Sequence, residues 1–325
     1  MSSLVELPDR AEETDTPFQG DLFTCVLTPV PVKDDVASMG LPIFSLSKNP
    51  DLRVREYVRD DVYVRITPPA IGAATIFDKD LLLYAASQLI AAKNNKQPVS
   101  QYIEIDASDF LKTTARGDGR ASFERILDML NRLNGTKIVT TRPTTDDEQT
   151  TEPFSLIETF RITSKKSRKA KGVTSKGKPI EREIIRVTRF QIKLSEWFYK
   201  NVLHFQVLTL DPGYYRLTSA IARRLYEIAR KHCGHQAVWK IGIDQLGEKI
   251  GSVEELRFLR REIRKIITED NLPEYRVALD TKTKPHQVVF YTRNGARLSK
   301  HLVGQNEFGW YQRLERCDNI TKRCG

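Results

Sequence analysis

Residues 243–267 read IDQLGEKIGSVEELRFLRREIRKII, a pattern that predicts two short helices joined by a glycine turn. Leu246 and Ile250 are four residues apart, so they share one face of the first helix. Gly251 suits the end of that helix, and Ser252 is placed to cap the next one. We therefore expect a helix-turn-helix unit in this part of the chain.

The second of these helices is expected to place a cationic stripe beside an apolar one. The apolar stripe recurs at helical spacing and consists of Leu256, Leu259, Ile263, Ile266 and Ile267. The cationic stripe is offset by one residue and consists of Arg257, Arg260, Arg261 and Arg264, with Lys265 beside it. Arginine forks read guanine edges and clamp phosphates, so this pattern is typical of a DNA recognition helix. The alternative is a solvated helix whose arginines pair with Glu254 and Glu262.

The overall composition bounds the function classes. The chain has 325 residues, a net charge of +10 and 40% apolar residues, which suits about two domains with ordinary cores. A basic balance permits nucleic acid or an anionic membrane as a partner. We expect no transmembrane helix, because no apolar run reaches about eighteen residues. We also expect no secretory signal, because residues 1–16 are acidic and polar.

The cysteines and histidines do not indicate a metal site. Cys25, Cys233, Cys317 and Cys324 form no C-x-x-C pair, which fits a reduced, cytoplasmic protein without zinc or disulfides. Residues 232–235 read HCGH, which we interpret as a helix end with Gly234 as its left-handed cap. We expect no metal and no cofactor, and the sequence contains no phosphate-binding P-loop.

A strongly basic segment lies between residues 165 and 189. It has ten Lys or Arg residues against Glu181 and Glu183, a net charge of +8. We predict a long hairpin whose basic loop, residues 165–182, lies on a phosphate backbone. The candidate contacts are Lys165, Lys166, Arg168, Lys169 and Lys171. The alternative is a mobile linker whose lysines only keep it soluble. A second hairpin, with strands at 275–279 and 287–291, carries Lys282 and Lys284 near its tip as further candidates.

The two halves of the chain show the same predicted order of elements. Each runs through a helix (76–94 and 218–233), a strand, a short helix, a longer helix (120–134 and 254–269) and a hairpin. This order predicts an α+β fold with two tandem winged-helix domains. The domains span residues 41–210 and 211–293, between a flexible arm at 1–40 and a weakly ordered tail at 294–325.

Three segments resemble the plasmid replication initiator protein A family of Gram-negative bacteria. They are GLPIFSLSK at 40–48, IGAATIFDKDLLLYA at 71–85 and LTSAIARRLYE at 217–227, and the likeness covers roughly residues 40 to 293. The resemblance implies two winged-helix domains that bind repeated sites (iterons) in double-stranded DNA at a plasmid origin, and thereby a role in plasmid copy number control. By position it places Arg257, Arg260, Arg261 and Arg264 in the recognition helix of the second domain, and Arg120 and Arg125 in that of the first.

The resemblance also implies events that follow DNA binding. These are melting of nearby AT-rich DNA with help from the host initiator, and then loading of the replicative helicase. It further implies a homodimer formed through the first domain, with origin binding by monomers. The tail after Asn294 has no counterpart in the family pattern. The likeness does not indicate which bases the arginines contact.

Two rival functions would use some of the same features. A tandem winged-helix transcriptional repressor would use the same DNA surfaces without helicase partners. A rolling-circle initiator would nick DNA with a tyrosine, for which Tyr199, Tyr214 and Tyr215 are the candidates. Nicking needs a metal, usually held by paired histidines, and the five histidines form no His-x-His pair. We therefore expect a DNA-binding protein that is not an enzyme and has no membrane partner.

Overall fold

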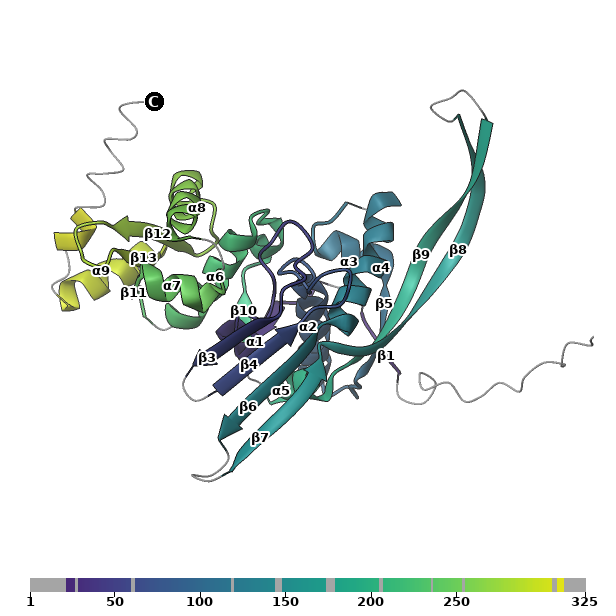
Figure 1. Ribbon diagram of the computed structural model, residues 1–325, viewed down its shortest axis with the longest axis horizontal. Helices are drawn as coiled ribbons and strands as arrows, with labels where there is room; N and C mark the ends of the chain where they lie inside the picture. Colours follow the sequence, from purple (N-terminus) through teal and green to yellow (C-terminus); the bar gives the residue numbers. More distant parts are fainter. Residues whose placement is uncertain are drawn as a thin grey trace, which may run out of the picture.

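The computed structural model describes residues 22–26, 29–59, 62–117, 120–143, 148–173, 179–204, 207–234, 236–252, 255–305 and 309–312. Within these residues the chain is a mixed α/β protein, as predicted. It consists of two units, each with its own large apolar core, which follow one another along the long axis of the molecule (Figure 1).

The first unit is built around helix α2, of which all but a few residues are buried. Its repeating elements are α2 (Lys79–Asn94), β5 (Tyr102–Asp106), α3 (Ala107–Thr113), α4 (Arg120–Gly135), β8 (Ile157–Val173) and β9 (Pro179–Leu194). The side chain of Asp106 accepts a hydrogen bond from the backbone N–H of Asp109 and so caps α3. The short strand β1 (Leu22–Thr24) runs parallel to β5 and extends the sheet to the order β1-β5-β9-β8.

The second unit repeats this arrangement. Its elements are α6 (Ala220–His232), β11 (Val238–Gly242), α7 (Ile243–Ile250), α8 (Leu256–Glu269), β12 (Tyr275–Asp280) and β13 (Gln287–Thr292). Its strands lie in the order β11-β13-β12, and the corresponding order in the first unit is β5-β9-β8. In both units, therefore, the second strand of the hairpin pairs with the strand that precedes the two helices. The order predicted for the two halves is confirmed from the first helix to the longer helix of each half; in the first unit the hairpin that matches β12–β13 is β8–β9, which does not follow α4 directly.

A second sheet in the first unit lies outside this repeat. It is antiparallel and consists of β3 (Arg55–Arg59), β4 (Val62–Thr67), β6 (Lys137–Pro143) and β7 (Gln149–Ser155). Strands β6 and β7 follow α4 directly, so they form the hairpin predicted after that helix. Helix α5 (Glu196–Leu203) follows β9 and packs on α2.

Short elements join the two units. Strand β2 (Val32–Asp35) pairs with β10 (Val207–Leu210), α1 (Val36–Gly40) packs on α6, and the short helix η1 (Pro212–Arg216) leads into the second unit. Val32, Met39 and Leu83 belong to the same apolar cluster as the core of the second unit. The two units therefore share a packed junction.

Two terminal segments are more ordered than their sequence pattern indicates. Within the predicted flexible arm (1–40) lie β1, β2 and α1, and Met39 is fully buried. Within the predicted weakly ordered tail (294–325), α9 (Gly295–Gly304) packs on β13, and Trp310 joins a third apolar cluster with Tyr291. These segments are too short to show clear periodicity, and distant partners order them. Residues 1–21 and 313–325 lie outside the described residues.

Two helix ends differ from their predictions. Gly251 ends α7 with a φ of 72°, as expected, but α8 begins at Leu256 with Glu255 as its N-cap, so Ser252 does not cap it. Gly234 is not a left-handed cap, because Gly72 and Gly251 are the glycines with positive φ in the described part of the chain. Two residues before Gly234, His232 stacks on Trp239, with ring centroids 4.2 Å apart. Where the chain is described, none of its helices has the length and apolarity needed to cross a bilayer.

Candidate nucleic-acid interface

Helix α8 packs on α7 through the predicted apolar stripe. Leu259, Ile263 and Ile266 are buried in the core of the second unit. A Cβ atom on Gly247 would lie 3.5 Å from Leu256 and 3.6 Å from Leu259, which shows how closely the two helices approach. Burial of this stripe fixes the rotation of α8 about its axis and turns the neighbouring cationic stripe outward.

The cationic stripe of α8 is largely exposed. The side chains of Arg257 and Arg261 are 71% and 68% exposed, Arg264 and Lys265 are also exposed, and Arg260 is half-buried. The nearest carboxylates lie 2.7 Å from Arg257 (Glu255), 3.6 Å from Arg261 (Glu262) and 3.7 Å from Lys265 (Glu269). Exposed ion pairs of this kind are worth about 0–1 kcal/mol. These cations can therefore exchange a carboxylate for a phosphate or a base edge at little cost.

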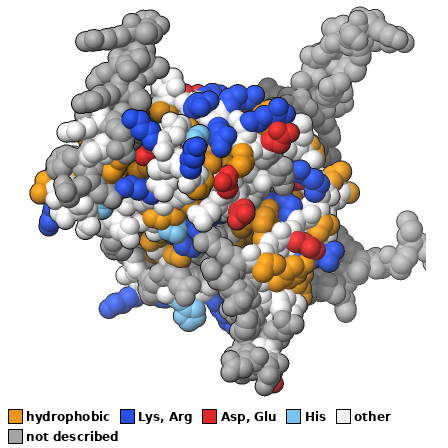
Figure 2. All heavy atoms as spheres, turned by 60° about the vertical axis from the view of Figure 1, so that its left-hand side comes forward, with side chains coloured by type: hydrophobic (Ala, Val, Ile, Leu, Met, Phe, Trp, Pro, Cys, Tyr) orange, Lys and Arg blue, Asp and Glu red, His pale blue; other side chains and the backbone are white. Residues whose placement is uncertain are grey.

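The hairpin after α8 carries further exposed cations. Lys282 and Lys284 are both exposed at the turn between β12 and β13. In Figure 2, which brings the second unit forward, Lys and Arg side chains gather along the upper part of the face. Helix α8 lies on that same upper side of the second unit in Figure 1. The two views thus place α8 on the side of the second unit where Lys and Arg side chains gather.

Among the described side chains, the first unit offers fewer free cations at the equivalent place. Arg125 is exposed on α4, whereas the side chain of Arg120 lies outside the described residues. Arg132 lies about two turns further along α4. It forms two 2.7 Å hydrogen bonds to Asp78, which hold its side chain against the first unit. Among the described side chains of α4, Arg125 is thus the cation turned to solvent.

The basic segment of the first unit is a hairpin arm and not mainly a loop. Strands β8 and β9 pair from Ile157 and Leu194 out to Val173 and Pro179, and the arm projects away from the body of the first unit (Figure 1). Most of the predicted basic loop (165–182) therefore lies in strands, because the pairing of β8 with β9 runs out along the arm, with register shifts after Thr163 and after Ser167. Lys165 is exposed. The side chains of Lys166, Arg168, Lys169 and Lys171 lie outside the described residues.

The turn of the α7–α8 pair is packed against the first unit. A Cβ atom on Gly251 would lie 2.6 Å from Pro42 and 2.9 Å from the hydroxyl of Tyr57. Only a glycine fits this approach, and its positive φ is also one that glycine adopts without strain. This contact holds the end of α7 in a defined position relative to the first unit.

The junction contains a buried ionic cluster that sequence reasoning did not identify. Lys79 forms ion pairs with Asp34 (2.7 Å) and Glu227 (2.9 Å), and Arg224 pairs with the other oxygen of Glu227 (3.0 Å). Burial raises the pKa of Asp34 to about 8, against the opposing charge of Lys79. Burial alone would lower the pKa of Lys79, but Asp34 and Glu227 hold it above its usual value. The signal in the sequence was the FDKD motif at 77–80, whose partners are distant.

Asp80 is the centre of a second set of ion pairs at the junction. Its carboxylate pairs with Arg223 on α6 and with Arg116 after α3, the latter at 2.9 Å. The guanidinium group of Arg223 also stacks over the ring of Phe77, 4.5 Å from the centroid. Charges from three separate parts of the chain therefore meet where the two units join.

Two of the three tyrosines considered for DNA nicking are not accessible to a phosphate. Tyr214 is fully buried, Tyr215 is 6% exposed, and the hydroxyl of Tyr214 donates a hydrogen bond to Glu227. Burial raises the pKa of both phenols well above the usual value. Tyr199 is half-buried. Where the chain is described, no group of three or more His, Cys, Asp or Glu side chains is placed to hold a metal ion.

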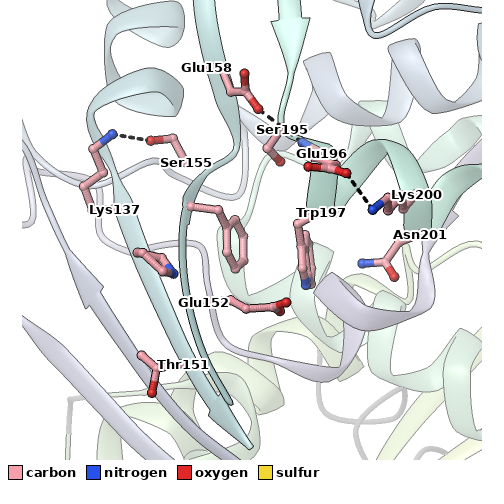
Figure 3. Close-up of a pocket in the computed structure, with 12 residues that line it drawn as sticks. Lys137, Thr151, Glu152, Ser155, Glu158, Ser195, Glu196, Trp197, Lys200 and Asn201 are labelled. Carbon is pink, nitrogen blue, oxygen red and sulfur yellow. Dashed lines mark hydrogen bonds and ion pairs between the residues drawn. The ribbon is translucent and has the colours of Figure 1, made fainter.

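A groove of about 830 Å³ lies between β7 and α5 (Figure 3). Its floor includes Phe154 and Trp197, whose stacked rings are 4.5 Å apart. Glu196 is held by Lys200 at 2.6 Å, and Lys137 donates to the hydroxyl of Ser155 at 2.7 Å (Figure 3). The charges of this groove are mixed, so it is not a continuation of the cationic surface.

Known proteins match this chain over most of its length. The family described as "Replication initiator protein A" matches residues 33–277. A curated protein of Wigglesworthia glossinidia brevipalpis, described as "Putative replication protein", is 33% identical over 246 residues, which are 75% of this chain and 84% of that protein.

Two crystal structures of domains 2 and 3 of RctB are similar in fold. One has a TM-score of 0.55 at 14% identity and covers 78% of this chain and 97% of its own. The other has a TM-score of 0.54 at 12% identity and covers 81% of this chain and 98% of its own. At such low identity the likeness concerns the fold alone.

Proposed function

Because this chain belongs to the replication initiator protein A family, we propose that it starts plasmid replication by binding iterons in double-stranded DNA at the origin. The observation that carries the proposal is the exposed cationic stripe of α8 beside its buried apolar stripe. A helix of this kind can enter a major groove while its core face stays packed.

Both units act as winged-helix domains in this proposal. The support is the repeated order of helix, strand, two helices and hairpin, with matching strand orders in the two sheets. Helices α4 and α8 are the recognition helices, and the β8–β9 arm and the β12–β13 hairpin are the wings. The long basic arm is then an enlarged wing, suited to contacts with phosphates along the duplex.

In this proposal the cationic residues fall into two groups, those that contact base edges and those that contact phosphates. Arg257 and Arg261 lie in the first turns of α8 and are largely exposed, so they are the leading candidates for base edges. Arg260 is half-buried and has less reach. Arg264 and Lys265, a turn further along, contact phosphates. Lys282 and Lys284 contact the backbone from the wing, together with Arg120 and Arg125 of the first domain and Lys165, Lys166, Arg168, Lys169 and Lys171 of the arm.

The later steps are proposed on the family resemblance. They are melting of AT-rich DNA beside the iterons with the host initiator, recruitment of the replicative helicase, and control of plasmid copy number. The protein works in the cytoplasm, forms a homodimer in the absence of DNA, and has no catalytic step or cofactor of its own. The rival role of transcriptional repressor would use the same DNA surfaces but would not support replication.

Two measurements test the proposal. Footprinting on duplexes selected by the full-length protein should show protection in two successive major grooves about one helical turn apart. Protection of a single half-site of about six base pairs would contradict binding by both units. Supplying the protein in trans to an origin plasmid that lacks its own initiator should restore replication. Repression of a promoter without any replication would favour the repressor.

A further inference from the structure

Phe258 is an aromatic side chain placed between two arginines of the proposed DNA-reading helix. It is the third residue of α8, and its ring centroid lies 4.9 Å from the guanidinium carbon of Arg257 and 5.1 Å from that of Arg261. The side chain is half-buried. None of the three apolar clusters formed by the described residues includes it. Its ring therefore belongs to the cationic face and not to the core.

The position of Phe258 on the helix is that of a groove-facing residue. Arg261 and Lys265 follow it at spacings of three and seven, so the three side chains share one face. The adjacent Leu259 points the other way and is 2% exposed. In a recognition helix the first turns lie deepest in the major groove. The ring is thus at the depth where base edges are met.

The two guanidinium groups restrict the ring. Cation–π contacts of this kind are attractive at exposed sites and favour a small range of orientations for all three side chains. An aromatic ring held in this way presents an apolar edge between two cationic forks. If the ring only held the two arginines in place, it would not affect which DNA sequence the protein prefers.

The major groove contains one apolar group that such an edge can recognise. Thymine carries a C5 methyl group there, and phenylalanine is among the side chains that contact it, whereas arginine pairs with guanine. Building on the function proposed above, we propose that Phe258 reads the methyl group of a thymine next to the base pairs met by Arg257 and Arg261. The cognate repeat then contains a thymine beside guanine at the α8 subsite.

The test removes one methyl group at a time from the DNA. A duplex selected from a random library by the full-length protein is re-synthesised with each thymine in turn replaced by deoxyuridine, and binding is measured by fluorescence anisotropy. At one thymine the replacement should weaken binding about fourfold, the value expected for removal of one buried methyl group. Absence of any sensitive thymine would overturn the proposal.

Variants of α8 connect that thymine to the ring. Phe258→Ala should bind the thymine and deoxyuridine duplexes equally. The matched control is Leu256→Ala, because Leu256 is a neighbouring, partly exposed apolar side chain that faces α7, and this variant should keep the fourfold difference. Persistence of the full difference in Phe258→Ala would assign the methyl contact to another residue and refute the inference.

A crosslinking experiment gives an answer that does not depend on whether the variant folds. The sensitive thymine is replaced by 5-iododeoxyuridine, whose iodine occupies the place of the methyl group, and the complex with unaltered protein is irradiated. Mass spectrometry should locate the crosslink at Phe258, and a crosslink outside α8 would overturn the proposal. If the unaltered protein selects no DNA sequence at all, the failure is that of the proposed function instead.

Discussion

The ammonium group of Lys79 lies 2.9 Å from a carboxylate oxygen of Glu227, and this fully buried ion pair joins the two units of the molecule. Lys79 begins α2 of the first unit, and Glu227 lies on α6 of the second, 148 residues away. Removing one member of a buried pair leaves the other charge without compensation in a medium of low polarity. The pair therefore ties the relative position of the units to the stability of the whole chain.

Removal of the Lys79 ammonium should be strongly destabilising. Lys79→Ala leaves Asp34 without its cationic partner and Glu227 with Arg224 alone, and the free energy of unfolding should fall by about 3–5 kcal/mol. Urea denaturation followed by circular dichroism measures this change. The control is Lys300→Ala on the exposed side of α9, which should stay within about 0.5 kcal/mol of the unaltered protein. Equal changes in the free energy of unfolding for the two substitutions would show that the buried pair contributes no more to stability than an exposed lysine.

Stability should decrease as the pH rises from about 5 to 8. Burial raises the pKa of Asp34 from an ordinary value of 3.8 to about 8, in a cluster with Lys79, Asp35 and Glu227. Between those two values the folded state holds more protons at Asp34 than the unfolded state, so each increase in pH favours unfolding until the folded-state pKa is passed. One proton accounts for at most about 1.4 kcal/mol per pH unit. Urea titrations across this range measure the slope of the unfolding free energy against pH, and this slope should be smaller in Asp34→Asn. An unchanged slope in that variant would show that another group takes up the proton.

Gly251 should tolerate no side chain. An alanine there must adopt a φ near 72° and meet Pro42 and Tyr57 at less than 3 Å, so Gly251→Ala should reduce stability by about 1–3 kcal/mol. Its cognate DNA affinity should fall as well, because the end of α7 shifts and α8 packs on α7. Gly295→Ala is the matched control, since nothing lies within 4 Å of a Cβ atom there. Thermal melting of both variants decides the matter, and a Gly251→Ala protein as stable as the control would contradict the role assigned to this contact.

Arg261 and Leu259 should separate specificity from stability on the same helix. Arg261→Ala should reduce the preference for the cognate repeat over random duplex by about tenfold or more, because a guanine fork is worth about 1–3 kcal/mol. Its fold should survive, since the side chain is 68% exposed. Leu259→Ala should instead cost about 2–5 kcal/mol of stability through a core cavity, since this side chain is 2% exposed. Affinities for both duplexes and urea midpoints test the pair. Equal weakening of cognate and random binding by Arg261→Ala would make this arginine a backbone contact.

The β8–β9 arm should contribute to DNA affinity without regard to sequence. Alanine at Lys165, Lys166, Lys169 and Lys171 should weaken cognate and random binding alike and flatten the salt dependence. For every phosphate that a lysine no longer neutralises, the log–log salt slope should decrease by about 0.9 in magnitude. Arginine at the same four positions keeps the charge and should keep the slope. A slope that is unchanged in the alanine variant would show that the arm is only a solvated extension.

Local pattern was enough to predict the elements that carry the proposed DNA surface. The spacing of Leu259, Ile263 and Ile266 predicted α8 and its buried side, and the one-residue offset of the arginines placed them next to that side. The repeated order of the helices was likewise predicted, because each helix shows its own periodicity. These features depend on contacts between residues a few positions apart.

Only the tertiary structure decided how the two units are joined. The sequence shows Asp78, Lys79 and Asp80 as a charged motif, but the partners of Lys79 lie 45 and 148 residues away, at Asp34 and Glu227. The same reason explains why β2 and α9 were missed: β2 is ordered by pairing with β10, and α9 by packing on β13. Periodicity reports only which face of a short segment is apolar. It carries no information about which distant segment covers that face, because the burial that stabilises it arises only when the whole chain is folded.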